Sequence, residues 1–416
     1  MSNDSEGFNL RSHSVALMVA LALSGPLIDA QTPAPAEPLT LEAAFARALT
    51  ANQTIAAARL SQAVNQAGVG VARELPNPEG RIEYTKETPK EAYTLALPVE
   101  LGGKRRKRVA IGEATVRTGE AELNRTILDI RGQVRHAYFN QLIAEARVKL
   151  LDELQQFATR AHEAAQQRFD AGSAPRLEVL QAQLALAQAE NEATVARASA
   201  HAASVELNAL LGFPLDSTAV LVTTPDSAGT VAVEVATAQA QASNAELAVL
   251  DRQIEEASAR IALARAMRVP DVTPEAALTR DAEPEFDTGW RAAVSFTLPL
   301  FTTHVSGVRV AEATLEQLRT QRDATLARIT GEVSSAVALA EAQRQAYLRY
   351  RDQVLPQAQE VESMAEDSYR LGQTGIAALL QALQASRDAR LQGLLAASSY
   401  QDAITEVEHA IGAPIP

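Results

Sequence analysis

Apolar residues recur at helical spacing early in the chain and then give way to a two-residue alternation. Residues 41–75 carry the helical pattern, and Thr40 directly before them is a candidate N-cap. Pro76 and Pro78 end the run, because proline cannot continue a helix. We therefore predict one helix over residues 41–75, followed by strands.

Alternation of apolar and polar residues predicts short β-strands in both halves of the chain. Residues 81–86, 93–99 and 290–298 alternate in this way. Strands of about ten residues are long enough to cross a bilayer within a barrel, and a small soluble sheet packed on helices is the alternative. Four strands in one chain cannot close a barrel, so a pore would require several chains to pool their strands.

Two further stretches, 105–171 and 306–371, are predicted to form uninterrupted helices. At about 1.5 Å per residue, each would be about 100 Å long. Apolar residues spaced by three and four positions, such as Val308, Ala311 and Leu315, predict lateral packing in coiled-coil fashion. An elongated coiled-coil scaffold in the cytoplasm would explain these helices as well, but it would not explain the strands.

The chain contains an internal repeat. Three pairs of segments match in the same order, about 200 residues apart: RFDAGSAPRLEVLQA (168–182) with SYRLGQTGIAALLQA (368–382), LGFP (211–214) with IGAP (411–414), and LPV (97–99) with LPL (298–300). We predict two structural repeats, 40–215 and 231–416, joined by a linker at 216–230. Each repeat is expected to contain a helix, two strands, a very long helix, a sharp turn and a further helix.

The N-terminal residues have the pattern of an export signal. Arg11 precedes the apolar run 15–23, and small residues lead to a cleavage site after Ala30. We predict a signal peptide over residues 1–30 and a flexible, proline-rich lead-in over 31–39. No later stretch reaches the roughly 18 to 20 apolar residues that a membrane-spanning helix needs, so any membrane insertion is expected to use strands.

Composition narrows the class of function. Aromatic residues make up only 4% of the chain, which favours long packed helices over a compact core. The 51 acidic and 38 basic residues give a formal net charge of −13, which disfavours nucleic acid as a partner. The chain has no cysteine, so disulfides, thiolate metal sites and a lipid-modified N-terminal cysteine are excluded.

Motifs for catalysis, cofactor binding or metal binding are absent from the sequence. Five histidines remain beyond the export signal, and none lies three or four positions from another: His136, His162, His201, His304 and His409. The sequence has no nucleophile elbow, no phosphate-binding loop and no dinucleotide fingerprint at a strand–helix junction. We therefore expect no enzyme, no cofactor and no resident metal.

The chain resembles the TolC-like outer-membrane efflux factors in its order of elements, its tandem repeat, its two glycine turns and the motif LPVELGGKRRKR (97–108). This motif is similar to that of the cobalt-zinc-cadmium resistance branch in particular. The resemblance covers residues 40–415. It implies a mainly helical fold with a β-barrel portion: a homotrimer in which long antiparallel helices form a periplasmic α-barrel and four strands per chain are pooled into a twelve-stranded transmembrane barrel. It also implies an outer-membrane location and two partners, a periplasmic membrane-fusion adaptor and an inner-membrane, proton-driven efflux transporter.

The end of that motif is predicted to be a strand–helix junction. Gly102 and Gly103 allow the chain to change direction. Positive charge at the start of a helix opposes the helix dipole, so helix stability does not explain the five cations that follow. These are Lys104, Arg105, Arg106, Lys107 and Arg108. We expect them to contact anionic headgroups of the outer-membrane lipid, and a merely solvated cluster is the alternative.

Two turns are predicted to join long helices far from the strands: Gly172-Ser173-Ala174-Pro175 and Gly372-Gln373-Thr374-Gly375. Helix-ending glycines explain both structurally, and the family resemblance implies that this tip docks the adaptor and narrows the pore. Many members carry aspartates just beyond the second turn, where this chain has Ala378 and Gln381. Glu178 beyond the first turn, with Gln181 near it, is the candidate for a ring of three carboxylates. A solvated surface glutamate is the alternative.

Together these features favour a passive outer-membrane duct of a tripartite efflux pump that carries heavy-metal cations. The export signal and the strands distinguish it from the soluble coiled-coil scaffold. A second hypothesis is the same duct serving multidrug efflux or protein secretion. The sequence of the duct does not separate these cargoes.

Overall fold

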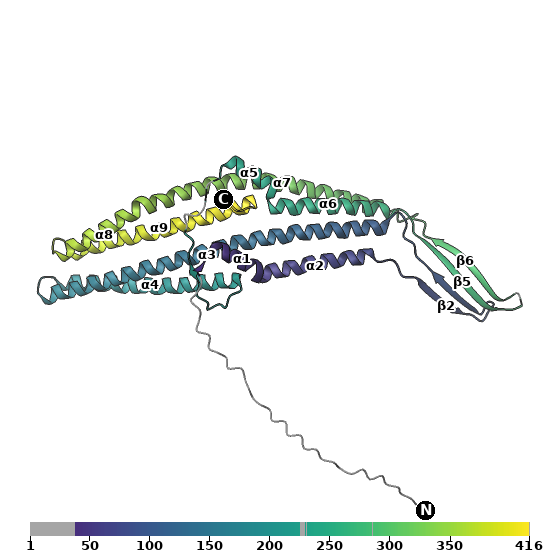
Figure 1. Ribbon diagram of the computed structural model, residues 1–416, viewed down its shortest axis with the longest axis horizontal. Coiled ribbons are helices and arrows are strands. Elements are labelled where there is room, and N and C mark those ends of the chain that lie inside the picture. Colours follow the sequence, from purple (N-terminus) through teal and green to yellow (C-terminus); the bar gives the residue numbers. More distant parts are fainter. Residues whose placement is uncertain (1–37, 225–228, 230, 285, 416) are drawn as a thin grey trace, which may run out of the picture. The chain divides into compact units, whose positions relative to one another are not determined.

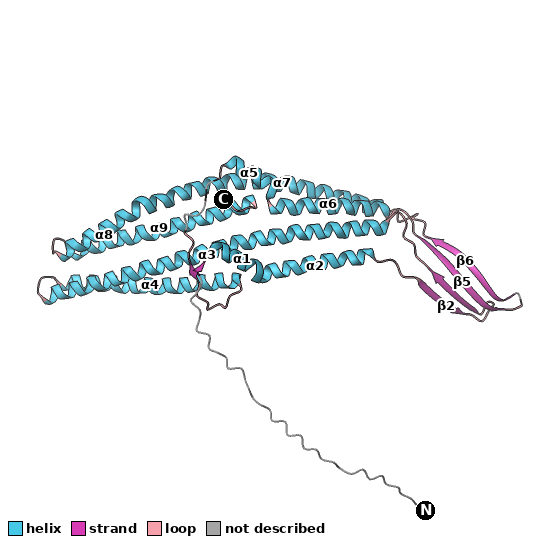
Figure 2. Cartoon of the chain, viewed as in Figure 1, coloured by secondary structure: helices cyan, strands magenta, loops and turns pink. Residues whose placement is uncertain are grey.

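The computed structural model describes residues 38–415 except 225–228, 230 and 285. The predicted signal peptide over 1–30 lies outside the described residues. Helices dominate this part of the chain (Figures 1 and 2). Its elements are β1 (Pro38–Leu39), α1 (Leu41–Ala51), α2 (Gln53–Arg73), β2 (Glu79–Tyr84), β3 (Glu91–Ala96), α3 (Lys104–Asp170), α4 (Arg176–Leu211), β4 (Val220–Leu221), α5 (Val233–Ser243), α6 (Ala245–Ala266), β5 (Val272–Ala282), β6 (Phe286–Phe296), α7 (Val305–Arg349), the π-helix η2 (Tyr350–Val354), α8 (Leu355–Arg370) and α9 (Ile376–Ile411).

The order of elements in the first half recurs in the second. Helices α1 and α2 lead to the strand pair β2–β3, and α3 and α4 then form a long hairpin. The second half runs through α5, α6, β5 and β6, and α7, η2 and α8 together take the place of α3 before α9. The strands of both halves join one antiparallel sheet in the order β2-β3-β5-β6 (Figure 2). The repeat boundaries at 40–215 and 231–416 stay predictions.

The helix predicted over 41–75 is in fact two helices, because Asn52 interrupts it. Thr40 caps α1 as predicted, since its Oγ1 accepts the N–H of Ala43 at 3.1 Å. At Asn52 the backbone is extended, and the side-chain oxygen accepts the N–H groups of the second and third residues of α2. Asn244 caps α6 in the same way. An asparagine cap is a local competitor of the helix that periodicity alone does not reveal.

The same two asparagines fasten the short helices to the long hairpins. The amide nitrogen of Asn52 donates to the carbonyl of Leu210 at 3.0 Å. The amide nitrogen of Asn244 donates to the carbonyl of Ala410, also at 3.0 Å. Both acceptors lie in the last turn of a helix, where backbone carbonyls have no intrahelical partner. In each half, one asparagine side chain therefore caps the start of one helix and binds a backbone carbonyl at the end of another.

The glycines of the LGFP and IGAP motifs end α4 and α9. Gly212 and Gly412 have left-handed backbones, with φ of +63° and +78°. A Cβ at Gly412 would lie 2.6 Å from the carbonyl oxygen of Ser243, and one at Gly212 would lie 3.0 Å from the Cβ of Ala51. Glycine is therefore required both by the backbone angle and by the close approach of α1 to Gly212 and of α5 to Gly412.

The first long helix is continuous and the second is not. Helix α3 has 67 residues and is about 100 Å long. The helix predicted over 306–371 is interrupted by η2, and Pro356 lies in the first turn of α8 directly after it. Proline has no N–H to donate, and its ring clashes with the carbonyl one turn earlier. The prediction of an unbroken second helix overlooked this proline and was wrong.

A two-stranded parallel sheet, β1 with β4, was not predicted. Tyr138 on α3 organises it: the hydroxyl donates to the carbonyl of Leu39 at 2.7 Å and accepts the N–H groups of the two residues after β4. The lead-in predicted as flexible over 31–39 is therefore structured at its last two residues, and the linker at 216–230 is structured at β4. Such two-residue strands carry no periodicity in the sequence.

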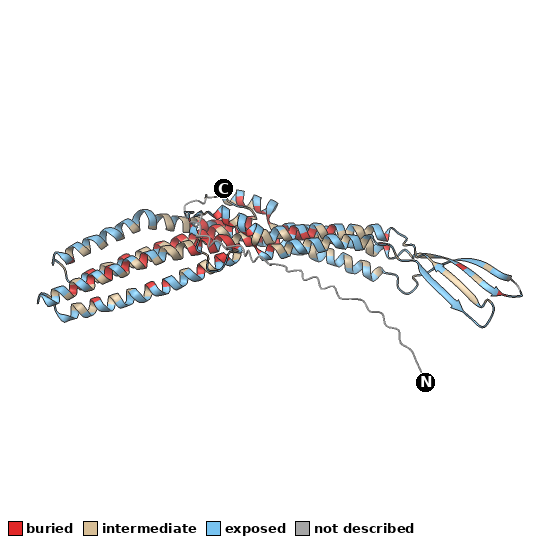
Figure 3. Ribbon diagram, turned by 60° about the horizontal axis from the view of Figure 1, so that its bottom comes forward, coloured by how far each residue is buried: buried red, intermediate tan, exposed pale blue. Residues whose placement is uncertain are grey.

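Buried side chains gather in two clusters where the short helices pack on the long ones (Figure 3). Fully buried members of the first cluster include Ile55, Val134, Tyr138, Phe139, Leu207 and Leu211. Members of the second cluster include Ala240, Ile329, Val333, Tyr400, Val407 and Ile411. Each cluster draws on the two shorter helices of one half, α1 and α2 or α5 and α6, and on the long helices of the same half. The middle of the helical region therefore has its own apolar core.

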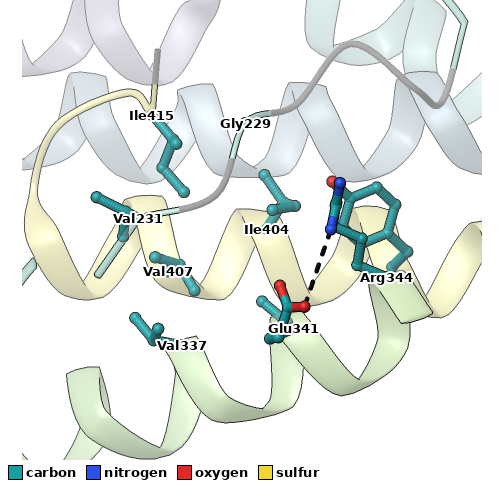
Figure 4. Close-up of a pocket in the computed structure, with 10 residues that line it drawn as sticks. Gly229, Val231, Val337, Glu341, Arg344, Ile404, Val407 and Ile415 are labelled. Carbon is teal, nitrogen blue, oxygen red and sulfur yellow. Dashed lines mark ion pairs between the residues drawn. The ribbon is translucent and has the colours of Figure 1, made fainter. Parts of the chain in front are cut away.

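A small cavity lies beside the second cluster (Figure 4). Val337 on α7 and Ile404 and Val407 on α9 line it, and Glu341 forms an ion pair with Arg344 at 3.8 Å beside them. Its volume of about 30 Å³ holds one water molecule at most. The cavity is a packing feature and is too small for a substrate.

The strands differ in length between the halves. β5 and β6 have 11 residues each, as expected for strands of about ten, but β2 and β3 have only six. One further bridge, from Val99 to Val272, extends the pairing beyond β3. Observed strand boundaries lie two to four residues before those predicted at 81–86, 93–99 and 290–298. Among the described residues, no helix combines the length and the apolar character needed to cross a membrane.

Candidate functional sites at the two ends of the long helices

The register of the four-stranded sheet gathers the apolar alternating residues on one face. Residues paired directly across neighbouring strands lie on the same side of a sheet. One such row crosses all four strands: Ile82, Tyr93, Leu278 and Trp290. The same face also carries Leu95, Val272, Val294 and Phe296. Trp290 is 83% exposed and Ile82 is 63% exposed, so no helix covers this face. A contiguous exposed apolar surface marks an interaction with lipid or protein.

The opposite face of the sheet is polar. Its rows are Arg81, Thr94, Ala277 and Arg291, and Glu79, Ala96, Glu275 and Ala293. Ser295 on this face donates a hydrogen bond to the carboxylate of Glu275 at 3.0 Å. A sheet with one apolar face and one charged face suits a boundary between hydrocarbon and water. A soluble sheet would instead cover its apolar face with the helices.

Both edges of this sheet are open within the described part of the chain. β2 and β6 are the outer strands, and each pairs on one side only. An unpaired strand edge exposes backbone N–H and C=O groups, which are costly to place in hydrocarbon and promote pairing with another chain. One chain therefore supplies a segment of a barrel wall and leaves it open at both sides.

The strand–helix junction after β3 is built on two left-handed glycines. Gly102 and Gly103 have φ of +69° and +68°. A Cβ at Gly102 would also approach the side chain of Val269 to 3.1 Å. α3 begins directly after these glycines, at Lys104.

Lys104 is a buried residue that holds this junction to the start of β5. Its Nζ lies 2.8 Å from Oδ1 of Asp271, and that carboxylate also accepts the N–H of Leu101 at 2.9 Å. Burial raises the pKa of Asp271, but the hydrogen bonds from Lys104 and Leu101 outweigh it and hold the pKa below its usual value. The first cation of the basic run therefore has a structural partner in the second half of the chain.

Two further cations of the run close the end of α2. Arg105 donates from Nε to the carbonyl of Arg73 at 2.7 Å. Arg108 donates to the carbonyl of Glu74 at 3.2 Å and pairs with the carboxylate of Glu100. Free carbonyls and the negative end of the helix dipole lie at a helix C-terminus, where cations are favourable. The basic run stabilises the end of α2, a role that the sequence analysis did not find.

The remaining two cations of the run, Lys107 and Arg106, differ in their contacts. Lys107 donates from Nζ to the carbonyl of Gly102 at 2.9 Å. Arg106 is exposed and forms no hydrogen bond or ion pair with any other residue that the structure describes. Contact of the run with lipid headgroups stays a prediction, and Arg106 is the member with no competing partner within the described part of the chain.

At the other end of α3, the two predicted turns have the same backbone. Gly172 and Gly372 both have φ of +70°. After each glycine, the next residue donates its N–H to the carbonyl five positions earlier, at 2.8 Å in the first turn and 2.9 Å in the second. This pattern is a Schellman motif. Nothing lies within 4 Å of a Cβ at either glycine, so only the backbone angle requires glycine there.

Glu178 is partly buried and lies near one residue beside each turn, Arg168 before the first and Tyr369 before the second. Its side chain is only 16% exposed, and its Oε2 lies 4.0 Å from Arg168. The guanidinium of Arg168 lies over the ring of Tyr369 at 5.0 Å from the ring centroid. Burial and the nearby charge of Glu178 raise the pKa of Tyr369. These three side chains connect the hairpin α3–α4 to the end of α8.

The other predicted constriction residues lie on α4 and α9. Gln181 is half-buried in a largely apolar groove of about 280 Å³ between these helices. Ala378 and Gln381 are exposed on α9, three positions apart and therefore on one side of the helix. Gln181 lies three positions after Glu178 on α4 and therefore on the same side of that helix. The place of these residues at a constriction stays a prediction.

Comparison with known proteins decides the family. The model of the outer membrane efflux protein family matches residues 44–213 and 236–413. The chain belongs to this family. It is also similar to the cobalt-zinc-cadmium resistance protein CzcC of Cupriavidus metallidurans, with 29% identity over 386 residues that cover 91% of each chain.

Solved structures of outer-membrane channels share the fold of this efflux protein. The CmeC channel of Campylobacter jejuni gives a TM-score of 0.75 at 16% identity and covers 90% of this chain and 86% of its own. The MtrE channel of Neisseria gonorrhoeae gives a TM-score of 0.73 at 18% identity and covers 90% and 89%. The predicted family, the mainly helical fold with a barrel-forming strand portion and the outer-membrane location with a long periplasmic part are thereby confirmed.

The efflux protein also contains pairs of residues that the sequence analysis missed. His136 on α3 lies 2.7 Å from Asp402 on α9, and His409 on α9 lies 3.2 Å from Asp129 on α3. The partners are 266 and 280 positions apart in the sequence, so a search by local spacing could not detect them. In the part of the chain that the structure describes, no three His, Asp or Glu side chains are close enough to hold a metal ion together.

Proposed function

We propose that this protein is the outer-membrane duct of a tripartite pump that exports divalent heavy-metal cations. The observation that carries the proposal is the two-faced, open-edged sheet at one end of helices about 100 Å long. Three copies would pool twelve strands and remove every open edge, with apolar faces toward lipid and polar faces toward a water-filled lumen. The proposed assembly is therefore a homotrimer.

The duct is passive and takes its energy from partners. The sequence carries no phosphate-binding loop. An inner-membrane transporter driven by the proton gradient would deliver the cargo, and a periplasmic adaptor would dock at the turns around Gly172 and Gly372. Cations as cargo are supported by the similarity to a protein named for cobalt, zinc and cadmium resistance and by the net charge of −13.

Growth of a deletion strain on zinc, cobalt, cadmium, copper and a panel of drugs tests the cargo. We expect sensitivity to the metals, restored by the wild-type gene, and unchanged tolerance of the drugs. Sensitivity to drugs alone would replace the metal cargo by multidrug efflux. Cell fractionation of the same strains should place the protein in the outer membrane, and a stable soluble monomer would contradict the duct itself.

A matched pair of strand variants tests the membrane-crossing sheet. Leu95→Arg places a charge on the apolar face and should cost about 2–4 kcal/mol per chain near the bilayer midplane, which blocks assembly. Ala96→Arg points to the polar face, where Glu79 and Glu275 are its cross-strand neighbours, and should assemble normally. Yields of trimer in detergent extracts measure both. Equal yields would show that these strands do not face lipid.

A further inference from the structure

A groove of about 920 Å³ lies along the seam between α3 and α9. Its lining contains no Lys or Arg among the described residues, in contrast to the groove around Tyr347, which contains Lys149, Arg351 and Arg390. Two imidazoles and four carboxylates line it: His136, His409, Asp129, Asp402, Glu206 and Glu406. A concave surface with this charge attracts cations.

The two histidine–aspartate pairs are arranged symmetrically across the seam. Nδ1 of His136 lies 2.7 Å from Oδ1 of Asp402, and Nε2 of His409 lies 3.2 Å from Oδ1 of Asp129. On each helix the two members are seven residues apart, so the pairs are separated by about 10 Å along the seam. Gly132 lies between them, where the helices approach closely.

Each aspartate leaves one ring nitrogen of its histidine available. Nε2 of His136 and Nδ1 of His409 have no hydrogen-bond partner among the residues that the structure describes. Histidines that bind metals almost always donate their other ring N–H to a carboxylate, a backbone carbonyl or water, which fixes the tautomer and the orientation of the ring. Glu406 lies three positions before His409, which places both on the same side of α9.

The pairs are not needed merely to hold α3 and α9 together. Arg135, whose side chain is only 7% exposed, already joins these helices: it donates to Glu408 and to Gln401, at 3.1 Å each. In contrast, the side chains of His136 and His409 are 55% and 60% exposed. In the single chain, solvent and dissolved ions therefore reach the histidines, while a buried network fastens the helices.

We propose that this groove binds divalent transition-metal cations through the free ring nitrogens of His136 and His409. Glu406 is a second ligand beside His409, and Asp402 and Asp129 are positioning residues that orient the imidazoles. Because no three such side chains meet at one point among the described residues, each histidine supplies an incomplete site whose other positions are filled by water. Weak, paired sites of this kind suit a cation in passage. Imidazole favours zinc, cobalt or nickel over magnesium.

This inference rests on the proposed cation efflux for its role but is tested without transport. The detergent-purified full chain, prepared without a polyhistidine tag, is titrated calorimetrically with zinc chloride and with magnesium chloride. We expect two zinc ions per chain and magnesium binding at least tenfold weaker. The double variant His136→Gln/His409→Gln should bind zinc at least tenfold more weakly. The control His201→Gln, an exposed histidine on α4 outside the groove, should bind as the wild type does.

The results separate the site from the function. Size-exclusion chromatography and circular dichroism confirm that each variant keeps the assembly and helix content of the wild type. Equal binding of magnesium and zinc, or an unchanged zinc isotherm in the double variant, would overturn the site. A protein that restores metal tolerance but binds no zinc would also overturn it and leave the duct intact. Saturable, histidine-dependent binding supports the site even if metal tolerance does not depend on the protein.

Discussion

The two long hairpins of this protein end in the same turn but reach it by different routes. α3 leads to Gly172 as one continuous helix. The matching path to Gly372 passes from α7 through the π-helix η2 into α8, with Pro356 where the first half has Gln156, 200 positions earlier. A π-turn followed by proline lacks regular i→i−4 hydrogen bonds and is a place where helices bend. The path to the first turn through α3 is therefore continuous, whereas the matching path through α7 and α8 contains a point where the helix can bend.

Ion pairs join the second hairpin, formed by α8 and α9, to the first, formed by α3 and α4. Arg390 on α9 donates to Glu153 on α3 at 2.8 Å, and Arg387 donates to Glu192 on α4 at 2.8 Å. Each of these partly exposed ion pairs contributes little on its own. Duplicated segments with matching turns thus differ in the continuity of one helix, and two ion pairs join the hairpins near that break.

The largest expected effect comes from placing a proline in α3 at the position that matches Pro356 of the second half. Gln156→Pro removes a backbone hydrogen bond from the middle of α3 and introduces a clash, which should destabilise the protein by more than about 3 kcal/mol. Pro356→Ala should leave stability unchanged or raise it. Thermal unfolding followed by circular dichroism measures both variants. A Gln156→Pro protein with wild-type stability would show that the continuity of α3 is unimportant.

Gly212 and Gly412, which end α4 and α9, extend the comparison of the two halves to the other ends of the hairpins. Gly412→Ala should cost about 2–3 kcal/mol, because the left-handed angle is strained for alanine and the new Cβ would meet a backbone oxygen at 2.6 Å. Gly212→Ala should cost less, about 1–2 kcal/mol, since the nearest atom is a methyl carbon at 3.0 Å. The difference in unfolding free energy between the variants is the measurement. Equal losses would mean that the backbone angle alone matters.

Much of this fold follows from patterns that the sequence displays directly. Periodicity located the long helices and three of the four strands of the large sheet, and the repeated glycine motifs located both turns. The breaks at Asn52 and Asn244 were missed because a capped helix restarts without losing its apolar spacing. The parallel pairing of β1 with β4 was missed because it depends on Tyr138, which is 99 positions from Leu39.

The candidate sites were less predictable than the fold. The basic run at 104–108 starts α3, and its partners Asp271, Arg73 and Glu74 depend on how the chain folds between β3 and that helix. Glu178 was singled out by its distance from a turn, whereas its contact with Arg168 and Tyr369 depends on the packing of two hairpins. Interactions across the repeats carry no local signal, so sequence identifies residue types and leaves their partners open.

At the tip, Glu178→Gln tests the contact between the hairpins. Loss of the charge leaves Arg168 partly buried without its carboxylate partner and should cost about 1 kcal/mol. If three copies of Glu178 surround the pore, cation preference in single-channel recordings should also fall, while the yield of trimer stays the same. Glu190→Gln, an exposed residue farther along α4 that forms no ion pair with another described residue, serves as the control. Unchanged ion selectivity would leave Glu178 with a packing role only.

The smallest expected effect concerns the starts of α3 and α7, where the halves use different residues at the same backbone angle. Gly103 has φ of +68°, and His304 at the matching junction has φ of +57°. A left-handed angle costs a residue with a Cβ about 1–2 kcal/mol, and glycine loses part of that advantage through the entropy of the unfolded chain. His304→Gly should therefore raise the unfolding free energy by up to about 1 kcal/mol, and Gly103→Ala should lower it by about 1 kcal/mol. Thermal unfolding of the purified assembly resolves changes of this sign. A loss of stability in His304→Gly would mean that the imidazole makes a stabilising contact in the assembled trimer that outweighs its backbone strain.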